Sequence, residues 1–176
     1  RFPGQPVAQI IVAGNALNWR AFDVSIRLSA PAVSSPWGGG ANVTTIARTI
    51  PPTTAADPVR LALHITADDS RTRWADAARL DLKLQLEPSL EHLLPTNAVL
   101  SAQLVDARAE WGRARELSIT ARCQPEGAQA AERTTWIDVT GDRLETRWGQ
   151  ADHLVAALSA RHGPTNYLPA RASLTF

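Results

Sequence analysis

Apolar and polar residues alternate along several stretches of this chain. Residues 80–87 read Leu-Asp-Leu-Lys-Leu-Gln-Leu-Glu, with a leucine at every second position. Because successive side chains of a β-strand point to opposite faces, this pattern predicts a strand with one apolar and one polar face. The same alternation covers 22–30, 59–67, 98–104, 117–123 and 154–160, and a weaker version covers 135–139. The chain is therefore predicted to be rich in half-buried strands.

These stretches recur with a period of 37 residues. Trp37, Trp74, Trp111 and Trp148 follow one another at this spacing, and a glycine or an alanine follows each of them. Six positions after each tryptophan stands an apolar residue, namely Val43, Leu80, Leu117 and Leu154. Internal repeats of about 20–50 residues are typical of solenoids, propellers and other stacked arrays. We expect one repeat domain over residues 1–176, with units of about 1–36, 37–73, 74–110, 111–147 and 148–176.

Prolines are predicted to end one strand in three of the units. Pro51, Pro88 and Pro125 each stand fourteen residues after a repeat tryptophan. Proline has no N–H group to donate to a β-ladder, so each is predicted to follow the last residue of a strand. A third short strand is predicted just before each later tryptophan. Loops are predicted at 51–58, 88–97, 125–134 and 162–170, with single helical turns favoured at 89–94 and 128–133.

Strands that are apolar on one face have to cover that face. Stacked repeats would join such strands into a continuous, curled antiparallel sheet, so the fold is predicted to be mainly β with few short helical turns. Both an open groove and a folded-over sandwich satisfy this pattern. A β-propeller is a further alternative, although its blades normally have four strands and glycine-rich turns, and this chain has 10 glycines.

The apolar face of the predicted sheet is the candidate functional surface. Aligned side chains from successive units would form one groove suited to acyl chains. The residues expected to line this lipid-binding groove are Phe22, Val24, Ile26, Leu28, Leu61, Leu63, Ile65, Leu80, Leu82, Leu84, Leu86, Leu100, Leu117, Ile119, Leu154 and Leu158. The repeat tryptophans are predicted to lie at the sheet margin, where they either pack one unit on the next or line the groove. Packing is the favoured interpretation.

Composition argues against nucleic acid as a partner. The chain has 18 Lys+Arg and 17 Asp+Glu residues, a net charge of +1, so no strong field attracts a phosphate backbone. Cys123 is the only cysteine, which excludes an internal disulfide and predicts a small apolar core residue. No stretch approaches the roughly 20 apolar residues of a membrane-spanning helix. Because the chain begins at Arg1 and has no methionine, we expect it to be a segment of a longer protein.

No residue pattern predicts catalysis, a cofactor or a metal site. The histidines are scattered, and His64 and His153 are predicted to face solvent. Asp68-Asp69-Ser70 is typical of a turn. Gly38-Gly39-Gly40 lacks the Lys-Ser or Lys-Thr of a phosphate-binding loop and predicts a flexible turn or a bulge. The chain is therefore expected not to be an enzyme, because even a hydrolase of envelope polymers would need a clustered acid–base pair.

Two segments carry a resemblance to a known family. Residues 109–121 read Ala-Glu-Trp-Gly-Arg-Ala-Arg-Glu-Leu-Ser-Ile-Thr-Ala, and residues 146–154 read Thr-Arg-Trp-Gly-Gln-Ala-Asp-His-Leu. Both resemble the repeats of the AsmA-like superfamily of bacterial envelope proteins, which includes TamB and YhdP relatives. The resemblance extends over residues 20–176 and consists of a tryptophan, small residues and alternating leucines.

This resemblance implies a curled β-sheet whose apolar groove carries phospholipid, or another acyl-chain lipid, through the periplasm. It implies a role in phospholipid transport or outer-membrane homeostasis, with no catalytic motif and with envelope proteins as further candidate partners. The full-length protein would be anchored to the inner membrane by a segment outside this chain. The chain departs from the family pattern because it has no N-terminal anchor helix and is shorter than a bridge between membranes. The alternative is a structural repeat, such as an adhesin stalk or a propeller, with a closed, dry core.

Overall fold

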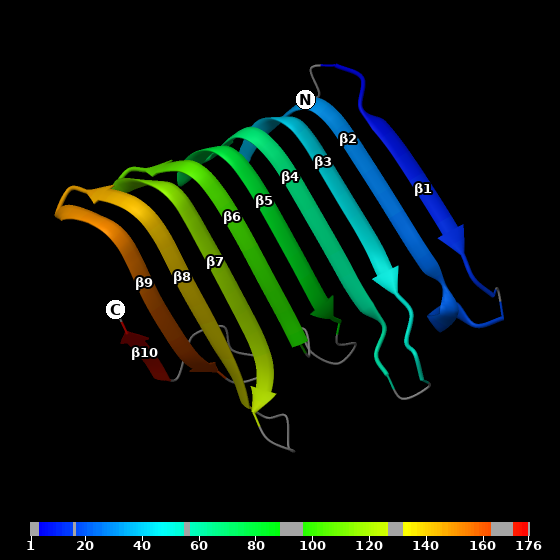
Figure 1. The fold of residues 1–176 in the computed structure, drawn as a ribbon. Helices are drawn as coiled ribbons and strands as arrows, with labels where there is room; N and C mark the ends of the chain where they lie inside the picture. The colour runs from blue at the N-terminus through cyan, green and yellow to red at the C-terminus, as the bar shows by residue number, and fades with distance from the viewer. Residues whose placement is uncertain are drawn as a thin grey trace.

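The computed structural model describes residues 4–15, 17–54, 57–88, 97–126, 132–162 and 171–175. These residues form one antiparallel sheet of ten strands, in which the order of the strands in space is their order along the chain. Figure 1 shows the strands side by side, from β1 at one edge of the sheet to β10 at the other. The prediction of a mainly β, continuous antiparallel sheet is confirmed.

Most strands are long, and one short 3-10 helix, η1 (Trp19–Ala21), lies between the first two. The strands are β1 (Val7–Ala13), β2 (Asp23–Ser35), β3 (Gly38–Ile50), β4 (Arg60–Thr72), β5 (Ala75–Glu87), β6 (Asn97–Ala109), β7 (Gly112–Glu126), β8 (Glu132–Thr146), β9 (Gly149–His162) and β10 (Arg171–Thr175). The alternation of the sequence predicts neither η1 nor β1. The β1 sequence, VAQIIVA, has apolar residues at both odd and even positions.

Four hairpin turns repeat with the period of the sequence. Each consists of two residues, of which the second is a repeat tryptophan, as in Arg73-Trp74 between β4 and β5. Two strands of 13 residues, the turn and the connection to β6 together account for the 37 residues from Arg60 to the residue before Asn97. The predicted third short strand is wrong as a separate element. It is the last part of β4, β6 and β8, which run without interruption to their turns.

A hydroxyl group closes three of the four hairpins. In the β4–β5 hairpin, Thr72 Oγ1 donates a hydrogen bond to the carbonyl of Ala75 (2.8 Å) and accepts bonds from the N–H groups of Trp74 and Ala75 (3.2 and 3.0 Å). Thr146 makes the same three contacts in the β8–β9 hairpin, and a serine in the β2–β3 hairpin makes two of them. The β6–β7 hairpin has Ala109 at this position. The hydroxyl satisfies backbone groups in the turn that the β-ladder does not reach.

The register of the strands aligns the alternating apolar residues on a single face. Leu63 of β4 is paired with Leu84 of β5, which is paired with Leu100 of β6. The row continues through Ala121, Ile137 and Leu158 on one side and through Ala47, Ile26 and Ile10 on the other. Because directly paired residues point to the same face, this one row crosses the sheet from β1 to β9.

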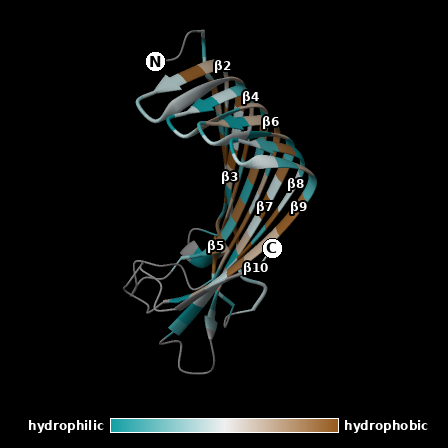
Figure 2. Cartoon of the chain, turned by 90° about the vertical axis from the view of Figure 1, so that its left-hand side faces the viewer, coloured by the Kyte–Doolittle hydropathy of each residue, from teal (hydrophilic) through white to brown (hydrophobic). Residues whose placement is uncertain are grey.

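The sheet is bent, and its hairpin end curls over (Figure 2). Four residues inside strands have a positive φ, namely Asn42 (48°), Asp69 (46°), Asp106 (50°) and Arg143 (49°). A left-handed residue changes the direction of a strand, and the last three are one period apart, so the bend belongs to the repeat. The prediction of a turn at 68–70 is therefore wrong. These residues lie inside β4 and bend the strand without ending it.

The apolar face lies on the inside of this bend. Ala67, Ala77, Ala107 and Ala114 lie near the left-handed residues and are at most 8% exposed, although no second layer covers them in the described part of the chain. Side chains converge on the inner side of a curved sheet, which buries small residues there. The left-handed residues themselves are exposed. We call the inner surface the concave face and the opposite surface the convex face.

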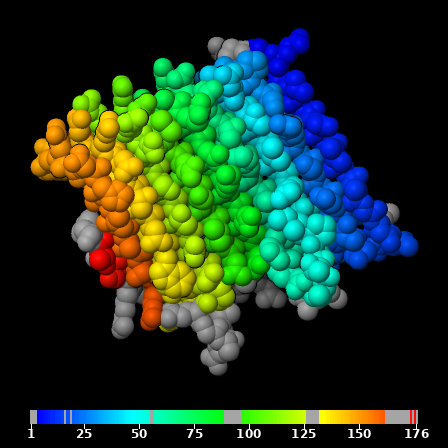
Figure 3. Space-filling view, in the orientation of Figure 1, coloured from blue at the N-terminus to red at the C-terminus, as the bar shows by residue number. Residues whose placement is uncertain are grey.

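The described sheet is a single layer with two free edges. β1 and β10 each pair with one neighbour only among the described strands, and they do not pair with each other. The chain exposes 12325 Å² of surface, whereas a compact monomer of the same mass exposes about 8,400 Å². Figure 3 shows successive strands as neighbouring bands across one face, with no second layer of described residues in front of them. Of the two shapes that the sequence left open, the sheet has the open one.

One of the three strand-ending prolines lies inside a strand. Pro51 and Pro88 directly follow β3 and β5, as predicted. Pro125, in contrast, belongs to β7 and is paired with Arg133 of β8, so both strands extend into the loop predicted at 125–134. Arg133, which was expected in a helical turn, is therefore a strand residue.

The other helical predictions fall on residues that the structure does not describe. The turn favoured at 89–94 and residues 128–131 of the second turn lie outside the described residues. The predicted bulge near the three glycines is confirmed, because the register between β3 and β4 shifts between Gly39 and Ala41 and again between Ala41 and Thr44.

The convex face carries ion pairs between strands. His64 Nε2 lies 3.1 Å from Asp81 Oδ1, and Lys83 Nζ lies 3.6 Å from the same oxygen. His153 Nδ1 lies 2.7 Å from Asp142 Oδ1. Both histidines therefore lie on the solvent side of the sheet, as predicted. Among the described residues no group of three or more metal-ligating side chains comes together.

Candidate binding surface

The concave face brings together all but one of the residues predicted to line a groove. They project from six strands and occupy adjacent rows of the sheet. On this face lie Val24, Ile26 and Leu28 of β2, Leu61, Leu63 and Ile65 of β4, Leu80, Leu82, Leu84 and Leu86 of β5, Leu100 of β6, Leu117 and Ile119 of β7, and Leu154 and Leu158 of β9. Alternation and period alone therefore located this surface.

Phe22 is the exception. It stands directly before β2, and its carbonyl accepts a hydrogen bond from Thr49 Oγ1 (2.9 Å). Its ring lies against Gly14, where an added Cβ would come within 2.9 Å of a ring carbon. Phe22 therefore packs on the connection between β1 and β2, outside the rows that the other predicted residues form.

A hollow of about 290 Å³ lies on the concave face between β2 and β5. It is lined by six of the predicted residues, namely Val24, Ile26, Leu61, Leu63, Leu84 and Leu86. Ala47 and Thr49 of β3 also line it and were not among the predicted residues, because the strand of the first unit is more polar. Ala47 is paired with Ile26 on one side and Leu63 on the other, so its small side chain leaves the space that forms the hollow.

Thr49 contributes an apolar surface to this hollow although it is a polar residue. Its hydroxyl donates to the carbonyl of Phe22 (2.9 Å) and accepts from the N–H of Val24 (2.8 Å). Both backbone groups lie at the start of β2, so the hydroxyl extends the hydrogen bonding between β2 and β3. With the hydroxyl engaged in these bonds, Thr49 faces the hollow with its methyl group.

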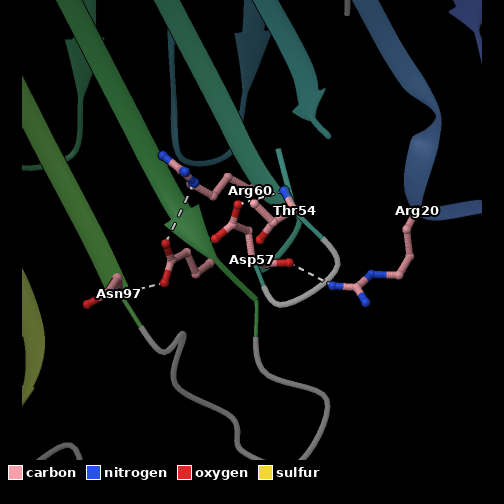
Figure 4. Close-up of polar contacts among 6 residues, drawn as sticks. Arg20, Thr54, Asp57, Arg60 and Asn97 are labelled. Atoms are coloured by element: carbon pink, nitrogen blue, oxygen red, sulfur yellow. Dashed lines mark hydrogen bonds and ion pairs between the residues drawn. The ribbon is translucent and has the colours of Figure 1, made fainter. Parts of the chain in front are cut away.

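Polar side chains gather at the ends of the strands away from the hairpins (Figure 4). Arg60 and Glu87 are the chain neighbours of Leu61 and Leu86, and Arg60 Nε lies 3.7 Å from Glu87 Oε1. Asn97 Nδ2 donates a hydrogen bond of 2.5 Å to Glu87 Oε2. Because Arg60 alternates with Leu61 and Glu87 with Leu86, these three side chains continue the polar contacts of the convex face across β4, β5 and β6.

A second set of contacts in Figure 4 ties down the connection between β3 and β4. Arg20 Nη2 of η1 donates to the carbonyl of Asp57 (2.7 Å), and Asp57 Oδ2 accepts from the N–H of Thr54 (2.8 Å). The hollow itself is lined almost entirely by carbon atoms. Binding sites for small apolar ligands have the same arrangement, with few polar groups around a carbon-lined cavity.

The repeat tryptophans do not line this surface. Trp37, Trp74, Trp111 and Trp148 lie in the hairpin turns at the sheet margin, as predicted, but their exposed fractions are 72%, 67%, 56% and 71%. The expectation that they pack one unit on the next is therefore wrong. Contacts within the turn hold two of them, because the guanidinium carbons of Arg73 and Arg147 lie 5.3 and 4.3 Å from the ring centroids of the adjacent tryptophans.

Sequence reasoning missed one buried charged residue. Arg133 of β8 has an exposed fraction of 2%. Its sequence context, in a polar stretch after Pro125, predicts a loop and carries no signal of burial.

Comparison of the chain with protein-family models, with curated proteins and with solved structures gives no match. No helix among the described residues is both long and apolar enough to cross a bilayer.

Proposed function

We propose that this chain is a non-catalytic lipid-handling module whose concave face holds the acyl chains of a lipid. The observation that carries this proposal is an apolar face that extends over the sheet and is left open by the described residues. Each CH₂ group removed from water contributes about 0.8 kcal/mol to the free energy of binding. An uncovered apolar face that extends over several strands therefore favours an apolar ligand.

The hollow gives the proposal a starting point. Its floor is made mainly of aliphatic side chains. An acyl chain needs only such a carbon-lined surface, because it has no polar group to satisfy along its length. Rows that continue from strand to strand would let one chain lie across several repeats, or let several chains lie side by side.

The resemblance to the AsmA-like superfamily supports the cellular part of the proposal. The chain would be a periplasmic segment of a protein that is anchored to the inner membrane, with phospholipid or another acyl-chain lipid as its ligand. The proposed process is phospholipid transport or outer-membrane homeostasis. The alternative of a closed, dry structural core has less support, because the two edge strands of the described sheet do not meet.

The test compares two substitutions on opposite faces of the sheet. Leu61 lies on the concave face and Val99 on the convex face, and their exposed fractions are nearly equal, 38% and 39%. Leu61→Asn is expected to weaken binding of a fluorescent fatty acid by about tenfold, because it places an amide in the apolar floor. Val99→Asn is the matched control and is expected to bind like the original chain.

Mass spectrometry of the purified chain provides a second readout. The proposal expects phospholipid or fatty acid to co-purify with the original chain and with Val99→Asn, and less of it with Leu61→Asn. A chain that carries no lipid and binds no fatty acid would contradict the proposal. Equal loss of binding in both variants would show that binding does not depend on the concave face.

A further inference from the structure

Arg133 is a buried cation without a counter-charge among the described residues. Its side chain has an exposed fraction of 2%, and its Nε and Nη1 atoms have no hydrogen-bond partner. A guanidinium group keeps its positive charge in proteins, and buried charges are ordinarily paired. Two buried N–H donors without an acceptor make this position suited to an anionic group.

This arginine belongs to the concave face. Thr135 stands two residues further along β8 and is paired with Cys123 and with Ala160. Both of these residues lie on the concave face, because they have the same strand parity as Leu117 and Leu158. Arg133 has the same parity as Thr135 and therefore points to the same side of the sheet. It lies at the end of the strand away from the hairpins, the same end at which Leu61 and Leu86 of the hollow stand.

A row of apolar residues leads from the hollow to Thr135, two residues from Arg133 on the same face. Leu86, which lines the hollow, is paired with Ala98, and Ala98 is paired with Cys123, which is paired with Thr135. This row spans three strand spacings, or about 14 Å. A chain of methylene groups that begins in the hollow and crosses the strands along this row would end beside Arg133.

We propose that Arg133 pairs with the head group of the bound lipid, and that the ligand is an anionic amphiphile with a carboxylate or phosphate group. This inference rests on the proposed function, because it adds a head-group contact to the acyl-chain surface. Carboxylate and phosphate oxygens are the acceptors to which arginine binds most strongly. The acyl chain would account for the apolar rows, and the anion would account for the unpaired guanidinium.

The first experiment compares ligands that share one acyl chain. Laurate, lauryl phosphate and methyl laurate are titrated into the lipid-free chain. The acid or the phosphate is expected to bind at least about tenfold more tightly than the uncharged ester, although the ester is the more hydrophobic ligand. Whichever anion binds more tightly identifies the head-group chemistry. Inorganic phosphate alone is expected to bind far more weakly than lauryl phosphate.

The variants locate this preference. Arg133→Met is expected to abolish the preference for the anion over the ester, and Arg133→Lys is expected to keep most of this preference. Arg122→Met is the matched control, because Arg122 is an exposed arginine on the convex face of β7. A preference for the anion that persists in Arg133→Met would overturn the inference.

The two proposals fail in different ways. If the acid, the phosphate and the ester bind equally to the original chain, the head-group inference is wrong and the acyl-chain surface stands. If none of the three binds, both proposals are wrong. If inorganic phosphate binds as tightly as lauryl phosphate, Arg133 belongs to an anion site that is unrelated to lipid.

The stability of the lipid-free chain tests the competing explanation that a carboxylate of the chain itself pairs with Arg133. Replacing a buried, unpaired cation with an apolar side chain of similar length removes a desolvation penalty, so Arg133→Met is expected to raise the urea midpoint. Breaking an existing ion pair would lower the midpoint instead. A lower midpoint for Arg133→Met, with Arg122→Met unchanged, would overturn the inference.

Discussion

Leu80 and Leu117, one sequence period apart, occupy the same row of the concave face with only Leu104 between them. Equivalent side chains of successive units thus lie on one shared surface, and they are separated by one intervening strand. The repeat is therefore a repeat in space as well as in sequence, and each unit widens the same apolar face.

The first prediction concerns the residue between these two leucines. Leu104→Ala removes aliphatic contacts on the concave face and is expected to lower the free energy of unfolding by about 1–2 kcal/mol, less than at a fully buried site. Val105→Ala on the convex face is the control and is expected to cost about 0.5 kcal/mol or less. Urea unfolding followed by circular dichroism measures both. Equal losses would contradict the assignment of the two faces.

The second prediction concerns the left-handed residues that bend the strands. Arg143 has a φ of 49°, a conformation that costs a residue with a Cβ about 1–2 kcal/mol. Arg143→Gly is therefore expected to stabilise the chain by about 0.5–1 kcal/mol, after the entropic cost of glycine is subtracted.

Arg115 provides the control for this change. The register of β7 and β8 places it opposite Arg143, it is also exposed, and it has no positive φ. Arg115→Gly is expected to destabilise the chain by about 0.5–1 kcal/mol, because glycine weakens an ordinary strand position. If both substitutions shift the thermal midpoint in the same direction, the bend at Arg143 is not a left-handed one.

The third prediction concerns the hydroxyl groups that close the hairpins. Thr146→Ala removes the three contacts at the β8–β9 turn and is expected to cost about 1 kcal/mol. The converse change, Ala109→Thr, adds a hydroxyl to the hairpin that lacks one and is expected to stabilise the chain by about 0.5–1 kcal/mol. Chemical unfolding of both variants measures the effect. A destabilising Ala109→Thr would show that the four hairpins are not equivalent.

The fourth prediction concerns the exposed tryptophans. Trp74→Ala is expected to change the free energy of unfolding by about 1 kcal/mol or less, because the residue is 67% exposed and its ring lies beside the guanidinium of Arg73. Acrylamide is expected to quench most of the tryptophan fluorescence of the folded chain. A loss of several kcal/mol would instead restore the interpretation that this residue packs one unit on the next.

The fifth prediction concerns the free edge at β1. This strand pairs with β2 only among the described strands, contains no charged residue, and exposes Ile10 and Ile11 on opposite faces by 65% and 54%. Exposed apolar edge strands attract further strands. We expect association that rises with protein concentration in sedimentation velocity and that falls in Ile11→Lys. Unchanged association in this variant would place the contact elsewhere.

The apolar face could be predicted from sequence because it depends only on local rules. Alternation decides which side of a strand a residue faces, and the period decides which residues of successive units share a row. Leu63, Leu84 and Leu100 fall in one row for these two reasons alone. The loops did not change which residues share a row, because the hairpin turns recur with the same 37-residue spacing as the strands.

The bend and the buried charge could not be predicted in this way. Asp68-Asp69-Ser70 has the composition of a turn, and only the pairing of β4 with both neighbours shows that the strand continues through it. The burial of Arg133 depends on what surrounds the end of β8, which no pattern within the segment records. β1 escaped prediction because Ile10 and Ile11 break the alternation on which the other strands were recognised.

The strand order of the described sheet has a consequence for how such a protein changes in length. Each strand touches only the strands before and after it, so no contact closes the two ends of the array on each other. Deleting residues 75–111 would join Trp74 to Gly112 and bring β4 against β7, whose concave residues stand where those of β5 stood. Copies of this unit can therefore be gained or lost one at a time, and the width of the concave face is set by the number of units.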